Sequence, residues 1–310
     1  MCSSDRLAVF GPGREGALLE ASKSWAKQLM REAGVPTAEH WSASSEEQAL
    51  AALEAHGRPL VVKADGLAAG KGVFVCAGRT EALAAVHALA GDPQFTSAGQ
   101  SILVEERLDG VEVSVLAITD GRTIVTLPPL QDHKAAHDGD AGPNTGGMGA
   151  YCPTPFVDAE MLADVEARVL VPTVHAMRRM KVPFHGVLYA GLMLTAQGPK
   201  VLEFNARFGD PECEALMVRL DSSLLELLDA AVDRRLDAVA PPTWRDEASV
   251  TVVMAAEGYP GAVEKGRLIT GLEAAAAVPD VHVFHAATRL DGDRVLADGG
   301  RVLAVTALGS

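Results

Sequence analysis

The sequence predicts an α+β (α/β) fold that ends in a smaller, strand-rich part. Of the 310 residues, 48% are hydrophobic and 22% are charged, and the mean hydropathy is +0.14. This is the composition of a folded chain with a substantial core rather than of a disordered one. Short apolar runs bounded by glycine and proline alternate with segments of helical periodicity as far as Asp233, and strands dominate afterwards.

The first third of the chain predicts a strand and a helix, followed by a compact helix–strand–strand–helix–strand unit. Gly34 and Pro36 end the first helix, and Ser44-Ser45-Glu46-Glu47 is a capping signal for the second. The predicted elements are a strand over 7–10, helices over 15–33 and 44–57, strands over 59–64 and 73–76, a helix over 80–90 and a strand over 101–105.

The rest of the chain predicts further strands and two long helices. A polar, glycine-rich segment from Gln131 to Gly149 has no periodic pattern, so we expect a long loop there, and such loops are usually functional. Pro241 and Pro242 mark a linker over 239–246. The predicted elements are strands over 111–119 and 123–127, a helix over 158–180, a hairpin of strands 188–195 and 200–205, a helix over 212–233, and strands that include 249–254 and 301–306.

Charge and cysteine content exclude several classes of protein. The 27 Lys and Arg residues against 41 Asp and Glu give a net charge of −14, which argues against a nucleic-acid or anionic-membrane surface but allows small anionic ligands. The four cysteines are scattered without a C-x-x-C pair, no stretch approaches 18 apolar residues, and no signal peptide is recognisable. We therefore expect a cytoplasmic protein with reduced thiols and with neither nucleic-acid nor membrane partners.

Two glycine-rich segments compete as phosphate-binding loops. Gly11-Pro-Gly13-Arg-Glu-Gly16 formally matches the dinucleotide fingerprint, but the acidic residue expected after a second strand is missing, so a turn into a helix explains it better. The segment from Lys63 to Gly72 joins two strands, and its small residues allow backbone N–H groups to close over an anion between Lys63 and Lys71. Gly72 follows Lys71 where a Walker A loop has Ser or Thr. A flexible hairpin with incidental lysines is the alternative.

A third glycine-rich segment, Gly142 to Tyr151, follows a stretch with many charged side chains. Such a segment suits a small polar substrate that carries an amine together with a carboxylate or phosphate. An irregular surface loop is the equally open alternative. The charged and polar side chains that gather upstream are Asp132, His133, Lys134, Asp138 and Asp140.

Side chains of ligand type alternate along the strand that ends near residue 205. Glu203 and Asn205 are two residues apart and face the same side of a strand, so their oxygens suit Mg²⁺ that also contacts phosphates. Arg207 continues this face and offers a guanidinium to a phosphate. A solvent-facing edge strand with polar alternation is the alternative. The opposite face is predicted to be apolar, with Leu202, Phe204 and Phe208.

Several motifs in order carry a family resemblance. They are residues 19–23 (LEASK), 62–72 (VKADGLAAGKG), 131–134 (QDHK), 142–151 (GPNTGGMGAY), 186–193 (GVLYAGLM), 203–212 (EFNARFGDPE), 254–261 (MAAEGYPG) and 299–308 (GGRVLAVTAL). Together they resemble the ATP-grasp ligases and, more closely, the glycinamide ribonucleotide synthetase (phosphoribosylamine–glycine ligase) family. The resemblance implies an ATP-grasp fold, in which two lobes clasp ATP, followed by a small strand-rich C-terminal domain.

The resemblance also implies roles for individual residues. Arg207 and Asp210 match the residues that handle the γ-phosphate and the acyl phosphate, and Glu203 and Asn205 match ligands of Mg²⁺ (or Mn²⁺). The residues implied for ATP are two phosphate-binding lysines, three residues of a lid, and four around the adenine and ribose: Lys23, Lys63, Gly70, Lys71, Gly72, Glu105, Glu106, Leu108 and Glu112. The residues implied for the other substrates are Asp132, His133, Lys134, Gly146, Gly147 and Met148.

The implied reaction is ATP-dependent ligation. Glycine's carboxylate attacks the γ-phosphate of ATP, which gives glycyl phosphate and releases ADP. The amine of phosphoribosylamine then displaces phosphate from glycyl phosphate to give glycinamide ribonucleotide. Neither step needs a protein nucleophile, so positioning and electrostatics supply the catalysis. We expect ATP and Mg²⁺ as cofactors, glycine and phosphoribosylamine as partners, and a monomer. A catalytically silent ATP-binding fragment or paralogue, or another ATP-grasp ligase, is the alternative.

The chain departs from the family pattern at its ends and at two single positions. The resemblance divides it into 1–40 (the remnant of an N-terminal domain and a connecting helix), 41–105 (the lid subdomain), 106–246 (the central subdomain) and 247–310 (an incomplete C-terminal domain). Only the last strand of the family's first domain is expected here, so we expect ATP binding with weak ligase turnover. Gly13 and Ala135 replace the Ser or Thr and the Arg that are usual at these positions.

Overall fold

The computed structural model describes residues 8–56, 60–66, 72–92 and 101–309, and the chain forms two compact units. Unit 1 comprises Met1–Leu127, Phe156–Arg207 and Glu226–Val239, and unit 2 comprises Pro128–Pro155, Phe208–Leu225 and Ala240–Ser310. Helices combined with antiparallel sheets confirm the predicted α+β class. No helix in the described ranges is long and apolar enough to cross a bilayer.

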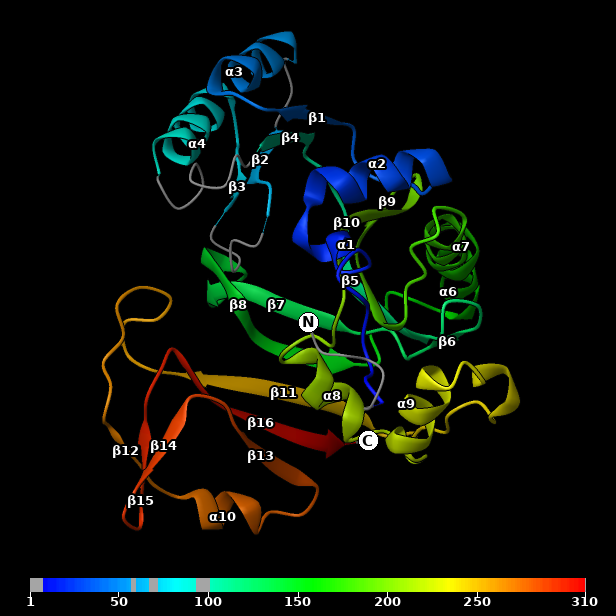
Figure 1. The fold of residues 1–310 in the computed structure, drawn as a ribbon. Coiled ribbons are helices and arrows are strands. Elements are labelled where there is room, and N and C mark those ends of the chain that lie inside the picture. Colours follow the sequence, from blue (N-terminus) through cyan, green and yellow to red (C-terminus); the bar gives the residue numbers. More distant parts are fainter. Residues whose placement is uncertain (1–7, 57–59, 67–71, 93–100, 310) are drawn as a thin grey trace. The chain divides into compact units, whose positions relative to one another are not determined.

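The first sheet of unit 1 is covered by two helices that lie side by side (Figure 1). Its strand order is β1-β4-β2-β3, with β1 His40–Ala43, β4 Ile102–Glu106, β2 Leu60–Ala64 and β3 Val73–Val75. The helices are α3 (Glu46–Ala55) and α4 (Arg79–Gly91). As the capping signal predicts, the Ser45 side chain accepts a hydrogen bond from the Gln48 N–H. Strand β1 was not predicted, because four residues with a single buried side chain give no periodic signal.

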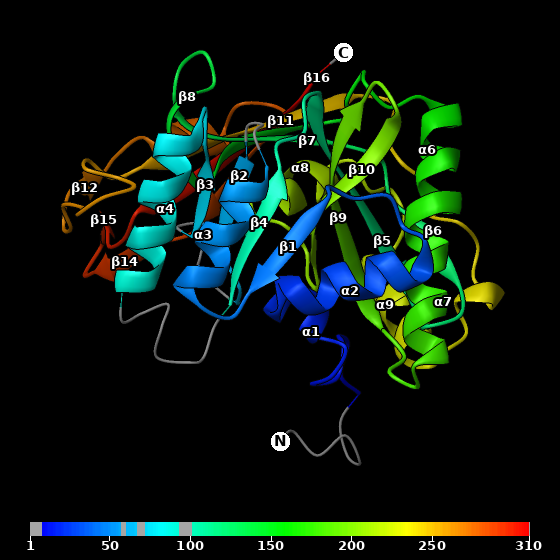
Figure 2. The same ribbon diagram turned by 90° about the horizontal axis from the view of Figure 1, so that it is seen from above.

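The second sheet of unit 1 has the order β10-β9-β5-β6, with β10 Gly198–Asn205, β9 Gly186–Thr195, β5 Val111–Thr119 and β6 Ile124–Thr126. Figure 2 shows α2 and α7 beside it, and these two helices contact each other. The hairpin of β9 and β10 and the strand over 111–119 were predicted from their apolar runs. Residues 113–119 are all buried, because both faces of β5 are covered, so its apolar run is almost unbroken.

Three predicted helices are interrupted. The helix expected over 15–33 is α1 (Leu18–Ala21) and α2 (Lys23–Ala33), because Ser22 adopts an extended conformation and its side chain caps α2 at the Trp25 N–H. The helix expected over 158–180 is α6 (Ala159–Val165), a π-helical turn (Glu166–Leu170) and α7 (Val171–Arg179). Pro172 has no N–H for the regular helical hydrogen bond, which accounts for the wider turn before it.

The helix expected over 212–233 is also two helices. They are α8 (Glu212–Met217) and α9 (Leu224–Val232). Between them, the Ser222 hydroxyl accepts a hydrogen bond from the Thr243 N–H and also bonds to the Thr243 hydroxyl. The Asp221 N–H donates to the Thr243 carbonyl. These polar residues satisfy their hydrogen bonds outside a helix, which ends α8.

Unit 2 contains a five-stranded sheet in the order β13-β16-β11-β8-β7 and a three-stranded sheet in the order β12-β15-β14. The strands are β7 Gln131–His137, β8 Ala141–Cys152, β11 Ala248–Ala255, β12 Leu268–Ile269, β13 Val281–His285, β14 Thr288–Asp291, β15 Arg294–Ala297 and β16 Arg301–Gly309. A short helix, α10 (Leu272–Ala276), precedes β13. The prediction of a strand-rich C-terminal part is confirmed.

The loop predicted from Gln131 to Gly149 is wrong: this segment forms the β7–β8 hairpin. Glycine has low strand propensity, but β8 pairs with β11 from Cys152 to Gly149, and the ladder hydrogen bonds decide its conformation. A Cβ at Gly149 would lie 2.8 Å from the Thr251 carbonyl oxygen, so this pairing requires glycine. Between the pairs His133–Gly149 and Ala135–Asn144, residues 145–148 lie opposite residue 134 alone, so they form a four-residue bulge in β8.

The strand predicted over 7–10 is also wrong where the structure can test it. Residues 8–10 are coil and pair with no strand of the described chain, and Leu7 lies outside the described residues. An apolar run of four residues becomes a strand only when a neighbouring strand satisfies its backbone.

Candidate active site

A buried carboxylate lies between two buried lysines in unit 1. Glu105 of β4, Lys63 of β2 and Lys27 of α2 are 2%, 6% and 2% exposed. Lys63 Nζ donates to Glu105 Oε2 at 3.0 Å, and Lys27 Nζ is 3.3 Å from Oε1 without hydrogen-bond geometry. Burial alone would raise the pKa of Glu105, but the two ammonium groups hold it below its ordinary value. The three groups form one charge cluster, which we call the Lys–Glu–Lys cluster.

The two lysines of this cluster have opposite pKa shifts. Burial lowers the pKa of Lys27 to about 8, although Glu105 opposes this. Burial also acts to lower the pKa of Lys63, but Glu105 and then Glu203 more than offset it, so that pKa is raised. Lys63 therefore stays charged at neutral pH, as a phosphate ligand must be.

Hydrogen bonds join the two sheets of unit 1 around the cluster. Lys27 Nζ donates to Thr37 Oγ1 at 2.6 Å, and Thr37 Oγ1 donates to the Val201 carbonyl at 2.6 Å. Lys63 Nζ also reaches the Leu202 carbonyl at 3.4 Å. Lys63 of β2 thus contacts β10 directly, and Lys27 of α2 is linked to it through Thr37. β10 is the strand that carries the predicted metal ligands.

Lys23 is held at the start of α2, next to the end of β2. Its Nζ donates to the Gly66 carbonyl at 2.8 Å, and burial lowers its pKa despite the opposing charge of Glu203. Asp65, two residues beyond Lys63, accepts hydrogen bonds from the Ser24 N–H at 3.3 Å and from the Ser24 hydroxyl. The charges of Lys23, Lys63 and Glu203 therefore act on one another in the folded chain.

The predicted lid and hinge residues are placed only in part. Gly70 and Lys71 lie outside the described residues, and the Gly72 carbonyl accepts from the Ala64 N–H at 2.8 Å. Leu108 lies between β4 and β5. The side chain of Glu106 accepts from Lys200 at 3.3 Å and from the Glu39 N–H at 3.1 Å. Glu112 is the second residue of β5 and lies opposite Met193 of β9.

A β-bulge orients the predicted metal ligands. The pairs Val201–Leu192 and Glu203–Gly191 shift the register at residue 202, so Val201 and Phe204, three apart, both enter the core. Leu202 was predicted to share that apolar face but is absent from the core cluster. Glu203 lies over Gly191, whose added Cβ would be 3.6 Å from the Glu203 Cγ.

Arg207 is oriented by an acidic residue that sequence reasoning missed. Its Nε donates to Glu20 Oε1 at 3.1 Å, and its Nη2 approaches Asn205 Oδ1 at 3.5 Å. The other oxygen of Glu20 accepts from the Ala206 N–H at 2.9 Å. Glu20 belongs to the LEASK motif, but nothing local in that motif indicates a contact with a residue 187 positions away.

The donors on β10 fit a hard divalent cation. Glu203 and Asn205 offer a carboxylate and an amide oxygen from alternate positions of one strand, which suits Mg²⁺ that takes its other ligands from phosphates and water. No group of three His, Cys, Asp or Glu side chains that could hold a metal occurs in the described part of the chain.

The predicted substrate residues lie in unit 2. Lys134 Nζ is 2.8 Å from Asp132 Oδ2, and the Asp132 side chain is 3% exposed. His133 stacks on Tyr151 with ring centroids 6.0 Å apart. The Thr145 hydroxyl donates to the Lys134 carbonyl at 2.8 Å and so anchors the bulge at residues 145–148.

Two residues from the C-terminal part hold this bulge, and sequence reasoning missed both. Arg301 Nη1 donates to the carbonyls of Gly146 at 3.0 Å and Asp210 at 2.6 Å, and it lies 3.1 Å from Asp210 Oδ1. The Gly146 N–H donates to the Tyr259 hydroxyl at 3.1 Å. Gly147 has a φ of +120°, and a Cβ there would lie 2.6 Å from Pro211 Cδ. Three motifs far apart in sequence, which carry Gly146, Asp210 and Arg301, therefore meet in unit 2.

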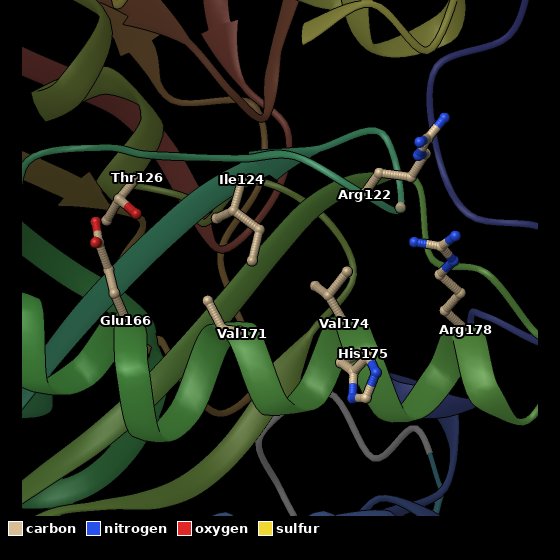
Figure 3. A pocket seen from close by; sticks show the side chains of 9 residues that line it. Arg122, Ile124, Thr126, Glu166, Val171, Val174, His175 and Arg178 are labelled. Carbon is tan, nitrogen blue, oxygen red and sulfur yellow. The ribbon is translucent and has the colours of Figure 1, made fainter. Parts of the chain in front are cut away.

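A surface cavity of about 330 Å³ lies away from these groups, between β6 and α7 of unit 1 (Figure 3). Arg122 and Arg178 lie at one end of it and Glu166 at the other. None of the residues predicted to bind ATP or metal lines it. Residues predicted to bind ATP and metal are instead brought together by the side-chain contacts described above.

Family models match most of the chain. The model described as phosphoribosylglycinamide synthetase, ATP-grasp (A) domain, matches residues 21–213, and the model for the C domain of the same enzyme matches residues 249–310. The chain belongs to the phosphoribosylglycinamide synthetase family. Both the resemblance stated from the motifs and the ATP-grasp fold are thereby confirmed.

Individual relatives agree with this assignment. The chain is 55% identical over 310 residues to phosphoribosylamine–glycine ligase of Rhodopirellula baltica, covering 98% of this chain and 71% of that protein. The crystal structure of phosphoribosylamine–glycine ligase from Thermotoga maritima superposes with a TM-score of 0.88 at 33% identity, covering 99% of this chain and 76% of that one. A biotin carboxylase domain from Hydrogenobacter thermophilus, solved with MgADP, shares the fold with a TM-score of 0.73 at 15% identity, over 99% and 66% of the two chains.

Proposed function

We propose that this protein joins glycine to 5-phosphoribosylamine at the expense of ATP, giving glycinamide ribonucleotide, ADP and phosphate in purine biosynthesis. The observation that carries the proposal is the meeting of Lys23, Lys63 and Glu203 in a family member whose relatives are named for this ligation. Those relatives also favour the ligase over a catalytically silent ATP-binding paralogue.

The side chains of unit 1 are proposed to bind the nucleotide. Lys63, kept charged by Glu105, and Lys23 would neutralise the phosphates, and the segment from Glu105 to Leu108 with Glu112 would hold adenine and ribose. Gly70, Lys71 and Gly72 are proposed to cover the phosphates. Each cation placed on the transferring phosphoryl group stabilises the charge that develops there.

The residues of β10 are proposed to hold the metal. Glu203 and Asn205 would bind Mg²⁺ or Mn²⁺, which supplies positive charge to the phosphates when bound. Arg207, aimed by Glu20, would contact the γ-phosphate. The MgADP seen in the distant biotin carboxylase domain is consistent with a nucleotide–metal complex as the ligand of this fold.

The residues of unit 2 are proposed to bind the other two substrates. Glycine and phosphoribosylamine would contact polar and cationic side chains of β7, namely Asp132, His133 and Lys134. The adjacent residues Gly146, Gly147 and Met148 are proposed to complete this site. Asp210 is proposed to act beside the acyl phosphate. We further propose a cytoplasmic monomer without nucleic-acid or membrane partners, in accord with the net charge of −14.

A product assay tests the proposal. ADP release by the purified chain is expected to require both glycine and phosphoribosylamine, and mass spectrometry is expected to detect glycinamide ribonucleotide. Lys63→Met, which keeps the side-chain stem and removes the charge, is the matched inactive control. ADP release that is indifferent to glycine, or no release in the presence of all substrates, would contradict the proposal.

A further inference from the structure

The guanidinium of Arg301 is engaged along only one of its edges. Every hydrogen bond and ion pair that it makes in the described residues uses Nη1, which contacts Gly146, Gly147 and Asp210. Nε and Nη2 have no acceptor there, and the side chain is 23% exposed. These two nitrogens form a planar, two-donor edge that matches the two oxygens of a carboxylate.

Glycine at position 146 keeps that edge open. A Cβ at Gly146 would lie 3.2 Å from Arg301 Cζ, 3.3 Å from Nη2 and 3.4 Å from Nε. Any larger residue would press on the guanidinium. The backbone N–H groups of the turn are already used, because Gly146 donates to Tyr259 and Gly147 donates to Thr145 Oγ1 at 3.0 Å. Of these groups, the Nε/Nη2 edge is the donor left for an oxyanion.

A carboxylate stands beside this open cationic edge. Asp210 Oδ1 pairs with Arg301 Nη1 at 3.1 Å, while the Asp210 side chain is 53% exposed and Oδ2 has no partner among the described residues. A second carboxylate oxygen in the neighbourhood, Oε2 of Glu214, is buried without a hydrogen-bond partner in the same described set. A guanidinium edge next to an available carboxylate complements a molecule that carries a carboxylate and an ammonium group.

We propose that Arg301 and Asp210 bind the zwitterion of the amino-acid substrate. The Nε/Nη2 edge of Arg301 holds the carboxylate, and Asp210 accepts the ammonium group. The inference rests on the proposed ligase function, which supplies glycine as the zwitterion. The 5′-phosphate of phosphoribosylamine offers similar oxyanion chemistry, so the experiment has one arm for each substrate.

The test compares Arg301→Lys and Asp210→Asn with the wild type, using Arg294→Lys on the exposed face of β15 as the matched control. Glycine affinity is measured by calorimetry with Mg²⁺ and a non-hydrolysable ATP analogue, and KM is measured separately for glycine and phosphoribosylamine. Loss of the two-point contact is expected to weaken glycine binding tenfold or more, equivalent to about 1.4 kcal/mol. Affinity for the ATP analogue is expected to stay within twofold, and Arg294→Lys is expected to change neither.

Three outcomes overturn the proposal. They are unchanged glycine affinity in both variants, a rise in the KM of phosphoribosylamine alone, or an equal loss of nucleotide and glycine binding, which would indicate general disruption of the fold. If the wild type itself neither binds glycine nor forms product, the proposed function fails instead. The wild-type measurement therefore separates the two failures.

Discussion

Replacement of Glu105 by Gln tests the buried Lys–Glu–Lys cluster of unit 1. The substitution keeps the shape of the side chain and removes a charge that is 2% exposed and lies 3.0 Å from Lys63 Nζ and 3.3 Å from Lys27 Nζ. Both ammonium groups are left buried without their counter-ion. Breaking a buried ion pair in this way costs about 3–5 kcal/mol.

The contributions of the two lysines can be separated. The lost charge-assisted hydrogen bond to Lys63 accounts for about 1.5–3 kcal/mol. Lys27, with a pKa of about 8, can instead release its proton. At pH 7 that release costs about 1.4 kcal/mol, one pKa unit, which limits its share. We expect Glu105→Gln to lower the free energy of unfolding by about 3–4 kcal/mol at pH 7.

The loss depends on pH in a predictable direction. The pKa of Lys27 is lower in the folded chain than its ordinary 10.5. The folded state therefore binds fewer protons than the unfolded state between pH 8 and 10.5, and Lys27 destabilises the folded state less as pH rises through that window. At pH 9 Lys27 is already mostly neutral in the wild type. The effect of Glu105→Gln should therefore be smaller at pH 9 than at pH 7 by about 1 kcal/mol.

Chemical denaturation followed by circular dichroism at pH 7 and pH 9 measures both effects. Glu54→Gln is the matched control, because Glu54 pairs with Arg79 at 3.2 Å but the two side chains are 70% and 58% exposed. We expect that control to change stability by less than about 0.5 kcal/mol. A loss below about 1 kcal/mol for Glu105→Gln, or one identical at both pH values, would refute the reasoning.

Four further predictions concern single residues. Lys63→Met should weaken ATP binding about tenfold or more by calorimetry, and binding within twofold of the wild type would contradict its phosphate role. Glu203→Ala should abolish the dependence of nucleotide affinity on Mg²⁺; retention of that dependence would rule out the metal assignment. Gly147→Ala should destabilise unit 2 by about 2 kcal/mol in thermal or chemical unfolding, because φ is +120° and the new Cβ meets Pro211, whereas Gly13→Ala, with open space and no left-handed φ, should be nearly neutral. Burial raises the pKa of Cys213 to about 12, so at pH 8 its alkylation, read by mass spectrometry, should be about a thousandfold slower in the folded than in the unfolded chain; similar rates would contradict this.

The sequence predicted the elements that have a strong local signal. The apolar run over 111–119 is β5, the β9–β10 hairpin lies where its turn predicted, and Ser45 caps α3. The alternation of Glu203 and Asn205 along one strand also survives in β10. Each of these features depends on side-chain spacing within one segment, which a single sequence records.

Elements that depend on a distant partner were missed or wrongly predicted. The segment from Gln131 to Gly149 has a loop-like composition, yet it is a hairpin because β11 completes its ladder. The run at residues 8–10 has strand-like composition, yet it is coil. Whether a backbone is paired is a property of its neighbours in space, so composition alone cannot decide it.

The sequence by itself determined the family and the motif residues from which ATP, metal and substrate binding are proposed, because those residue types recur at fixed local spacing. Only the tertiary structure showed that Lys27 shares Glu105 with Lys63, that Glu20 aims Arg207, and that Arg301 joins Gly146 to Asp210. These contacts bring together residues 78, 187 and 155 positions apart, counted from Lys27 to Glu105, from Glu20 to Arg207 and from Gly146 to Arg301. A charge gains its pKa, its orientation and its partner from the folded surroundings, and no pattern within one segment records them.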